Sequence, residues 1–121
     1  MSAWTWLGVA LLGGVGANAR FLIDGLTSAR AGGGLPFGTL VVNASGSLAL
    51  GLLTGLALGG DALVLAGAAT LGSYTTFSTW MLETHRLAED AKMRAALLNI
   101  AVSLAVGVAA AALGRTIGAH A

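Results

Sequence analysis

The sequence predicts an all-α membrane protein with four transmembrane helices, the third of them broken near residues 72–76. Three observations support this fold class. Of the 121 residues, 56% are hydrophobic and 9% are charged, a composition typical of membrane proteins. Four stretches are long and apolar enough to cross a bilayer, which takes about 20 residues of helix. The third stretch carries a run of hydroxyl side chains that disfavours an unbroken helix.

Four expected spans account for most of the chain. They cover approximately residues 4–23, 37–58, 62–82 and 93–113. The connectors are short, so residues 1–121 are expected to form a single four-helix membrane domain. The first span lacks the positive leader and the small-residue cleavage signal of a secretory peptide, and we therefore expect it to stay in the chain. The 19 glycines suit membrane helices, where small residues let backbones approach closely.

Composition also argues against several classes of function. The chain has no cysteine, so a disulfide framework, a thiolate metal site and a thiol nucleophile are all excluded. A net charge of +1 gives no broad basic surface for nucleic acid. His85 and His120 fall in an expected connector and in the tail, where solvated side chains are the plain explanation. No catalytic triad or metal-ligand cluster is visible, and an enzyme is not expected.

The first span ends in charged residues. Arg20 lies near the end of the apolar run, with Asp24 one turn further on. One interpretation is an interfacial arginine that snorkels to water and pairs locally. The other is that Arg20 sets a positive potential at a pore mouth.

Polar and small residues recur at a spacing of four in the second and fourth spans. In the second span the resulting helical face comprises Thr39, Asn43, Ser47, Gly51 and Gly55. In the fourth span it comprises Asn99, Ser103, Gly107, Ala111 and Arg115. Because a polar group facing lipid costs free energy, these faces should point at protein or at a watery path. Interhelical hydrogen bonds, worth about 0.6 kcal/mol each, would explain Ser47, Asn99 and Ser103 equally well. Asn43 favours a functional interpretation, because an amide near mid-span is costlier to leave unpaired.

The third span contains GSYTTFSTW at residues 72–80, with six hydroxyl side chains in nine residues. These residue types weaken a helix, so a break is expected near residues 72–76. Within a membrane, irregular backbone is tolerated where it is buried in protein or lines a cavity. Carbonyls freed by a break are ligands for a hard cation, and half-helix N-termini are seats for an anion.

Two rows of side chains follow the expected break. Phe77 and Trp80 lie three residues apart on one face, while Thr75, Thr79 and Glu83 form another row. The rim of an aromatic ring is electropositive, so hydroxyls beside ring edges would form a track of donors without a full positive charge. Ordinary packing of the aromatic pair remains the alternative.

Three motifs, taken together and in order, resemble the fluoride channel family known as Fluc or CrcB. They are GGVGANAR (13–20), GTLVVNASGSLALG (38–51) and GSYTTFSTW (72–80), the last followed by Glu83. The similarity covers essentially the whole chain. It implies a passive, fluoride-selective channel in the cell membrane that lowers cytoplasmic fluoride. It also implies an antiparallel dimer of dual-topology type, with two pores near the subunit interface and a structural Na⁺ at the centre.

The resemblance implies roles for individual residues. Backbone carbonyls of Gly72 and Thr75 would hold the Na⁺, one pair from each subunit. Asn43 matches the pore-lining asparagine that orients the aromatic pair and the anion. Phe77 and Trp80 occupy the two positions of the family's phenylalanine box. The anion pathway implied in this way comprises Asn43, Phe77, Ser78, Thr79, Trp80 and Ser103. Arg20 and Glu83 fall on vestibule positions.

This chain departs from the family pattern at a few positions. Ser73 replaces a usual glycine, and Trp80 replaces a usual phenylalanine. An indole is larger than a phenyl ring and its N–H is a true donor. Trp80 could therefore narrow the pore, bind the anion more strongly or mark one of two pores as inactive. Gly107 removes a possible hydroxyl one turn past Ser103.

Charge distribution predicts an orientation. The first and third connectors carry five of the six basic residues, namely Arg20, Arg30, Arg86, Lys92 and Arg94. Positive residues prefer the cytoplasm, so both termini are expected outside. A fixed orientation favours pairing with an oppositely biased paralogue, although a homodimer stays open.

Two other functions remain as alternatives to a channel of its own. A small four-helix multidrug-type transporter would need a membrane-embedded carboxylate, and residues 4–19 contain none. Glu83 is the only candidate, near a helix end. The other alternative is a non-conducting partner subunit of a heterodimeric channel, in which the polar stripes serve packing alone.

Overall fold

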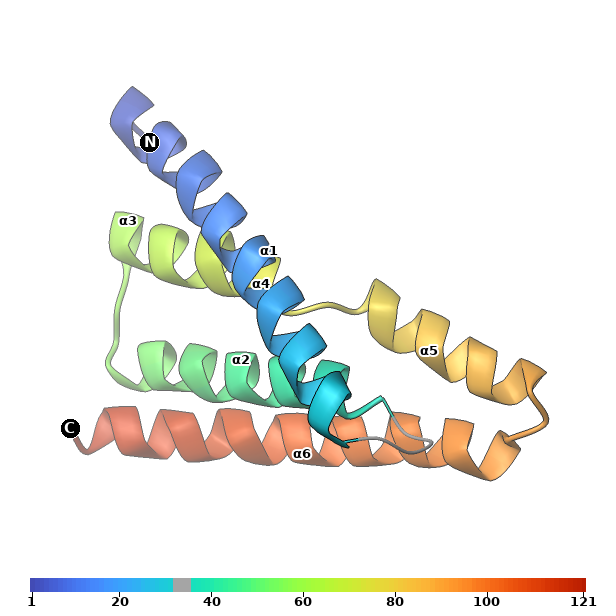
Figure 1. Ribbon diagram of the computed structural model, residues 1–121. Helices are drawn as coiled ribbons and strands as arrows, with labels where there is room; N and C mark the ends of the chain where they lie inside the picture. The colour runs from blue at the N-terminus through green and yellow to red at the C-terminus, as the bar shows by residue number, and fades with distance from the viewer. Residues whose placement is uncertain (32–35) are drawn as a thin grey trace.

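The computed structural model describes residues 1–31 and 36–121, and within them every regular element is helical (Figure 1). In chain order the elements are α1 (Ala3–Ala31), α2 (Phe37–Gly55), α3 (Gly60–Leu63), the π-helix η1 (Val64–Leu71), α4 (Gly72–Tyr74), α5 (Ser78–Glu89) and α6 (Met93–Ala119). Three of these helices, α1, α2 and α6, are long and apolar enough to cross a membrane. The all-α membrane class is therefore confirmed.

The third predicted crossing corresponds to α3, η1, α4 and α5, and is called the third crossing below. It is interrupted slightly later than the sequence predicts. Residues 72–74 are still helical, the backbone of Thr75 is extended at φ −79° and ψ 161°, and the helix resumes at Ser78. The break thus occupies residues 75–77 instead of 72–76. Gly72, which the sequence prediction included in the break, instead sits at the start of a helical turn.

The segment before the break is wound more loosely than an α-helix. In η1 the N–H of the following Gly72 bonds to the carbonyl of Gly67, five residues back. The hydroxyl of Thr70 donates to the carbonyl of Leu65 at 2.7 Å, again five residues back. Helix α1 packs closely here, because a methyl group at Gly16 would overlap the carbonyl of Thr70.

Helices α2 and α6 lie side by side and run in the same direction, while α1 crosses the molecule diagonally (Figure 1). Glycines allow this close approach. A side chain at Gly51 or Gly55 would overlap the carbonyl of Ala111 or Arg115 of α6. Gly114 meets the α2 backbone in the same way. The small-residue half of the predicted α2 face is therefore a packing surface.

Few apolar side chains are buried within a single chain. Among the described residues, the buried hydrophobic side chains are Val42, Ala69 and Ala96. The accessible surface is 7267 Å², against roughly 5,950 Å² for a compact soluble chain of this mass. Many exposed leucines, valines and aromatic residues make up the difference. Such a surface suits lipid and further protein, and not water.

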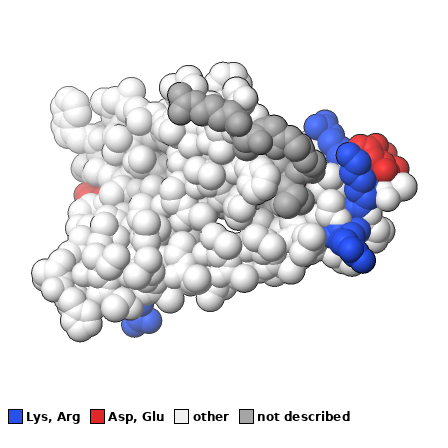
Figure 2. All heavy atoms as spheres, turned by 60° about the horizontal axis from the view of Figure 1, so that its bottom comes forward, with Lys and Arg blue, Asp and Glu red and all other residues white. Residues whose placement is uncertain are grey.

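Charge is concentrated at one end of the molecule (Figure 2). The end that carries the α5–α6 connector holds Arg86, Lys92 and Arg94, while both termini lie toward the opposite end, apart from each other (Figure 1). Residues 32–35, in the first predicted connector, lie outside the described residues, as does the side chain of Arg30.

One expected connector is helical. Helix α5 continues to Glu89, so the connector before α6 shrinks to residues 90–92. His85 consequently lies on α5, where it contacts Glu89 at 2.7 Å with both side chains exposed, and His120 is exposed after α6.

Candidate functional site

The amide of Asn43 holds the break in the third crossing. Its Nδ2 donates to the carbonyl of Thr76, and the N–H of Thr76 donates back to Oδ1, each at 2.8 Å. A side-chain amide carries one acceptor and two donor hydrogens, so it can replace the helical partners of a peptide group. Asn43 is half-buried on α2, and it joins that helix to the irregular backbone 33 residues later.

This bond redirects an amide that a continuous helix would use. In an α-helix the N–H of Thr76 would bond to the carbonyl of Gly72. In the structure that N–H donates to the side-chain oxygen of Asn43 instead. The Gly72 carbonyl therefore loses its regular partner.

The carbonyl of Thr75 loses its regular donor as well. In a continuous helix the N–H of Thr79 would donate to the carbonyl of Thr75, four residues back. In the structure it donates to the hydroxyl of Thr76 at 3.2 Å. Thr76 also donates its hydroxyl to Oγ1 of Thr79 at 3.1 Å, which stabilises the start of α5 in the manner of a capping residue. The helical donors of both carbonyls expected to bind a cation are thus bonded to side chains instead.

A groove of about 880 Å³ runs beside the break, between the third crossing and the pair α2 and α6. The residues of the sequence prediction that line it are Asn43, Gly72, Thr75, Phe77, Trp80 and Ser103. Most of the remaining lining is aliphatic. Ser78 and Thr79 do not line the groove of the single chain, and neither do Arg20 and Glu83.

The aromatic pair meets edge to face. The ring centroids of Phe77 and Trp80 are 5.7 Å apart with an interplanar angle of 85°. Phe77 is 69% exposed. The indole Nε1 of Trp80 donates to the backbone carbonyl of Asn99 on α6 at 3.2 Å. The indole N–H of Trp80, which the sequence analysis considered as a donor to the anion, is therefore bonded to the neighbouring helix α6.

The charged residues expected near the vestibule have different surroundings. Glu83 accepts a hydrogen bond from the buried hydroxyl of Thr39 on α2 at 2.5 Å. Nε of Arg20 is buried without a hydrogen-bond partner among the described residues. The carboxylate of Asp24 accepts instead from Ser28 at 3.3 Å, and no ion pair joins it to Arg20 in the part of the chain described. Local pairing of Arg20 with Asp24 is thus not observed.

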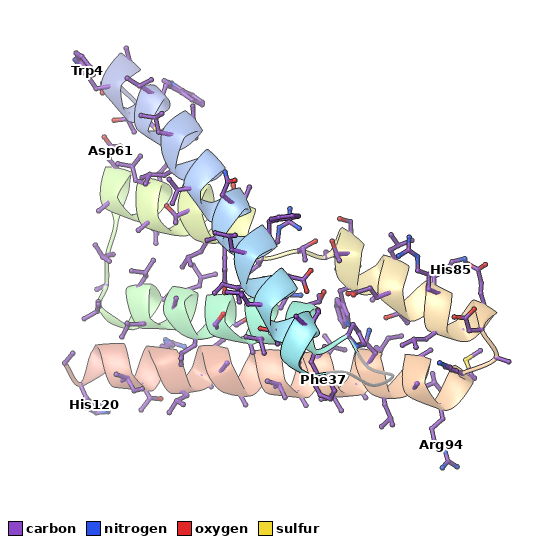
Figure 3. All side chains as sticks on the ribbon, viewed as in Figure 1. Trp4, Phe37, Asp61, His85, Arg94 and His120 are labelled. Atoms are coloured by element: carbon purple, nitrogen blue, oxygen red, sulfur yellow. The ribbon has the colours of Figure 1, made fainter. Side chains whose placement is uncertain are left out.

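The two ends of the molecule differ in the residues they present (Figure 3). Trp4, Asp61 and His120 lie at one end, and His85 and Arg94 lie at the other. The hydroxyl of Thr5 donates to Asp61 at 2.9 Å and so fastens α1 to the start of the third crossing.

Sequence reasoning missed the part played by Thr76. The signal for it was present, because threonine is favoured just before a helix, where its hydroxyl can accept from a backbone N–H of the first turn. The link from Asn99 to Thr84 was also missed, since no local pattern pairs residues on different helices.

Comparison with known proteins gives a consistent result. The family profile described as "CrcB-like protein, Camphor Resistance (CrcB)" matches residues 7–115. The chain is 58% identical over 110 residues to a protein of Mycolicibacterium paratuberculosis named "Fluoride-specific ion channel FluC 2", covering 91% of this chain and 90% of that one. A protein of the same name from Mycobacterium bovis is 54% identical, covering 93% and 89%. "Fluoride-specific ion channel FluC 1" of Symbiobacterium thermophilum is 45% identical, covering 96% and 97%.

Proposed function

Because this chain belongs to the CrcB family, we propose that it forms a passive, fluoride-selective anion channel that exports fluoride across the cell membrane. The observation that carries the proposal is the break at residues 75–77, held by Asn43 and open to the groove. Irregular backbone at membrane depth belongs where it is buried in protein or lines a cavity. A channel is also what the named relatives are, and no catalytic step is proposed.

The residues around the groove have chemistry that suits a small, strongly hydrated anion. A pore must replace the water of such an ion with close donors, yet bind weakly enough to release it. The amide of Asn43, the hydroxyl of Ser103 and the rims of Phe77 and Trp80 can do so without a fixed positive charge. Ser78 and Thr79 are proposed to join this pathway in the dimer. Arg20 and Glu83 are proposed to lie at its vestibules.

A structural Na⁺ is proposed to bind the carbonyls of Gly72 and Thr75. Neutral oxygens suit a hard cation, and these two have lost their helical donors to Asn43 and Thr76. When bound, the ion would lower the electrostatic barrier for a nearby anion.

An antiparallel dimer is proposed to cover the groove. Phe77 and the aliphatic lining are exposed in one chain, which supports a protein partner on this face. Basic residues gather at one end of the molecule, so we propose an oppositely biased paralogue as the partner and a homodimer as the alternative. Relatives named FluC 1 and FluC 2 are compatible with either arrangement.

Fluoride efflux from liposomes tests the proposal. Vesicles holding this chain should release fluoride rapidly and chloride slowly. Phe77→Ile should abolish release while the dimer persists, because the ring rim is lost. Phe21→Ile is the matched control, since that ring is 73% exposed on α1 and lies outside the groove.

Two outcomes would contradict a channel. Equal release of both halides would remove selectivity, and release that survives Phe77→Ile would remove the proposed pathway. If the chain alone is silent but conducts with a co-expressed paralogue, the heterodimer is supported. Silence in both settings would instead favour the non-conducting subunit.

A further inference from the structure

Three hydrogen bonds form a closed circuit between α5 and α6 beside the aromatic pair. The indole of Trp80 donates to the carbonyl of Asn99 at 3.2 Å. The side-chain amide of Asn99 donates to the hydroxyl of Thr84 at 2.8 Å, and that hydroxyl donates to the carbonyl of Trp80 at 2.8 Å. Asn99 and Thr84 are 6% and 8% exposed, so the circuit is shielded from competing partners.

The circuit fixes the spacing of the two helices at the level of Trp80. Thr84 lies one turn after Trp80, so its bond to Asn99 ties that turn to α6. The indole bond is the longest of the three and depends on this spacing. Its N–H is the only conventional hydrogen-bond donor on either ring of the aromatic pair.

We propose that Thr84 and Asn99 are positioning residues that keep the indole N–H of Trp80 bonded to α6, so that only the ring rim is offered to the anion. The inference rests on the proposed fluoride conduction. An N–H donor holds a charged acceptor far more firmly than a ring edge does, by roughly tenfold or more in affinity. An ion held so firmly would leave slowly, whereas conduction requires ready release.

Fluoride efflux from liposomes gives the first test. Thr84→Val removes the hydroxyl at nearly constant shape and should slow efflux roughly tenfold, because the freed N–H retains the anion. Adding Trp80→Phe to the same chain should restore efflux, since no N–H remains to trap fluoride. Thr84→Ser keeps a hydroxyl at this position and should therefore release fluoride at close to the original rate. Thr116→Val is the matched control, because Thr116 bonds only back to Ala112 on its own exposed turn at 2.9 Å.

Indole spectroscopy gives a readout that a merely structural role would not move. Trp4 and Trp6 are 82% and 60% exposed on α1, so replacing both with phenylalanine leaves Trp80 as the single indole. The resonance Raman band that reports indole N–H bonding should show a bonded N–H that is insensitive to added fluoride. In Thr84→Val the same band should shift on addition of fluoride and not of chloride.

Each failure has a distinct meaning. If Trp80→Phe does not restore efflux to Thr84→Val in an intact dimer, the circuit serves packing alone and the inference is wrong. A fluoride-sensitive indole in the unaltered circuit would overturn it even if Thr84→Val failed to fold. If the starting protein releases no fluoride, either alone or with a co-expressed paralogue, the proposed function fails instead, and the spectra alone decide whether Thr84 holds the indole.

Discussion

Replacing Asn43 with leucine should destabilise the protein far more than the same replacement of Asn18, whose amide is exposed on α1. Asn43→Leu preserves approximate shape and removes both 2.8 Å bonds to Thr76. It leaves one N–H and one carbonyl without their partner in a half-buried site. Each unsatisfied group costs about 1–3 kcal/mol, so the unfolding free energy should fall by roughly 2–6 kcal/mol.

The assay is reversible unfolding of the purified protein in mixed micelles, followed by far-ultraviolet circular dichroism. Asn18→Leu is the matched control, because its amide donates only to the carbonyl of Gly14 on the same exposed helix at 2.7 Å. That change should shift the unfolding free energy by less than about 1 kcal/mol. A loss below about 1 kcal/mol for Asn43→Leu, or equal losses for the two variants, would refute the assignment of Asn43 as the clamp of the break.

Two further predictions concern packing and turn geometry. Gly51→Val should force α2 and α6 apart and lower the unfolding free energy by about 1–3 kcal/mol, because its side chain would overlap the carbonyl of Ala111. Gly14→Val is its control, since nothing lies within 4 Å of the added carbon, and similar losses in both would contradict the packing argument. Ala91→Gly should stabilise by about 0.5–1 kcal/mol, because Ala91 has φ 59° in the α5–α6 connector. Thermal unfolding measures it, and an unchanged midpoint would contradict it.

Hydropathy predicted most of the fold because the bilayer imposes it. A span must satisfy its own backbone and expose apolar side chains to lipid, so long apolar runs predict α1, α2 and α6. Hydropathy underestimated the length of α5, since it detects segments that suit lipid and not helix formation as such. Residues 83–89 include Glu, Arg, Leu and Ala, which favour helix even where they leave the hydrocarbon.

The candidate site was predicted less completely for a related reason. Clusters of hydroxyl residues indicated that the third crossing breaks, because they bond locally and weaken a helix. The exact residues of the break depend on Asn43, which lies 33 positions away and captures the amide of Thr76. The π-helical winding of η1 and the bond from Asn99 to Thr84 likewise follow from tertiary contacts. Composition and spacing within one segment do not report such partners.

The amide of Asn43 couples the break to the proposed cation site, which affects how its variants are to be interpreted. By accepting from Thr76 it keeps that N–H away from the Gly72 carbonyl, and without this bond the break that presents the carbonyl is no longer held in place. A loss of fluoride flux in Asn43→Leu could then reflect either a missing anion donor or a weakened sodium site. Raising the sodium concentration separates them, because a ligand that binds only the native arrangement favours it by mass action. Flux that recovers with sodium would assign the defect to the carbonyls, whereas flux that does not recover would assign it to the anion path.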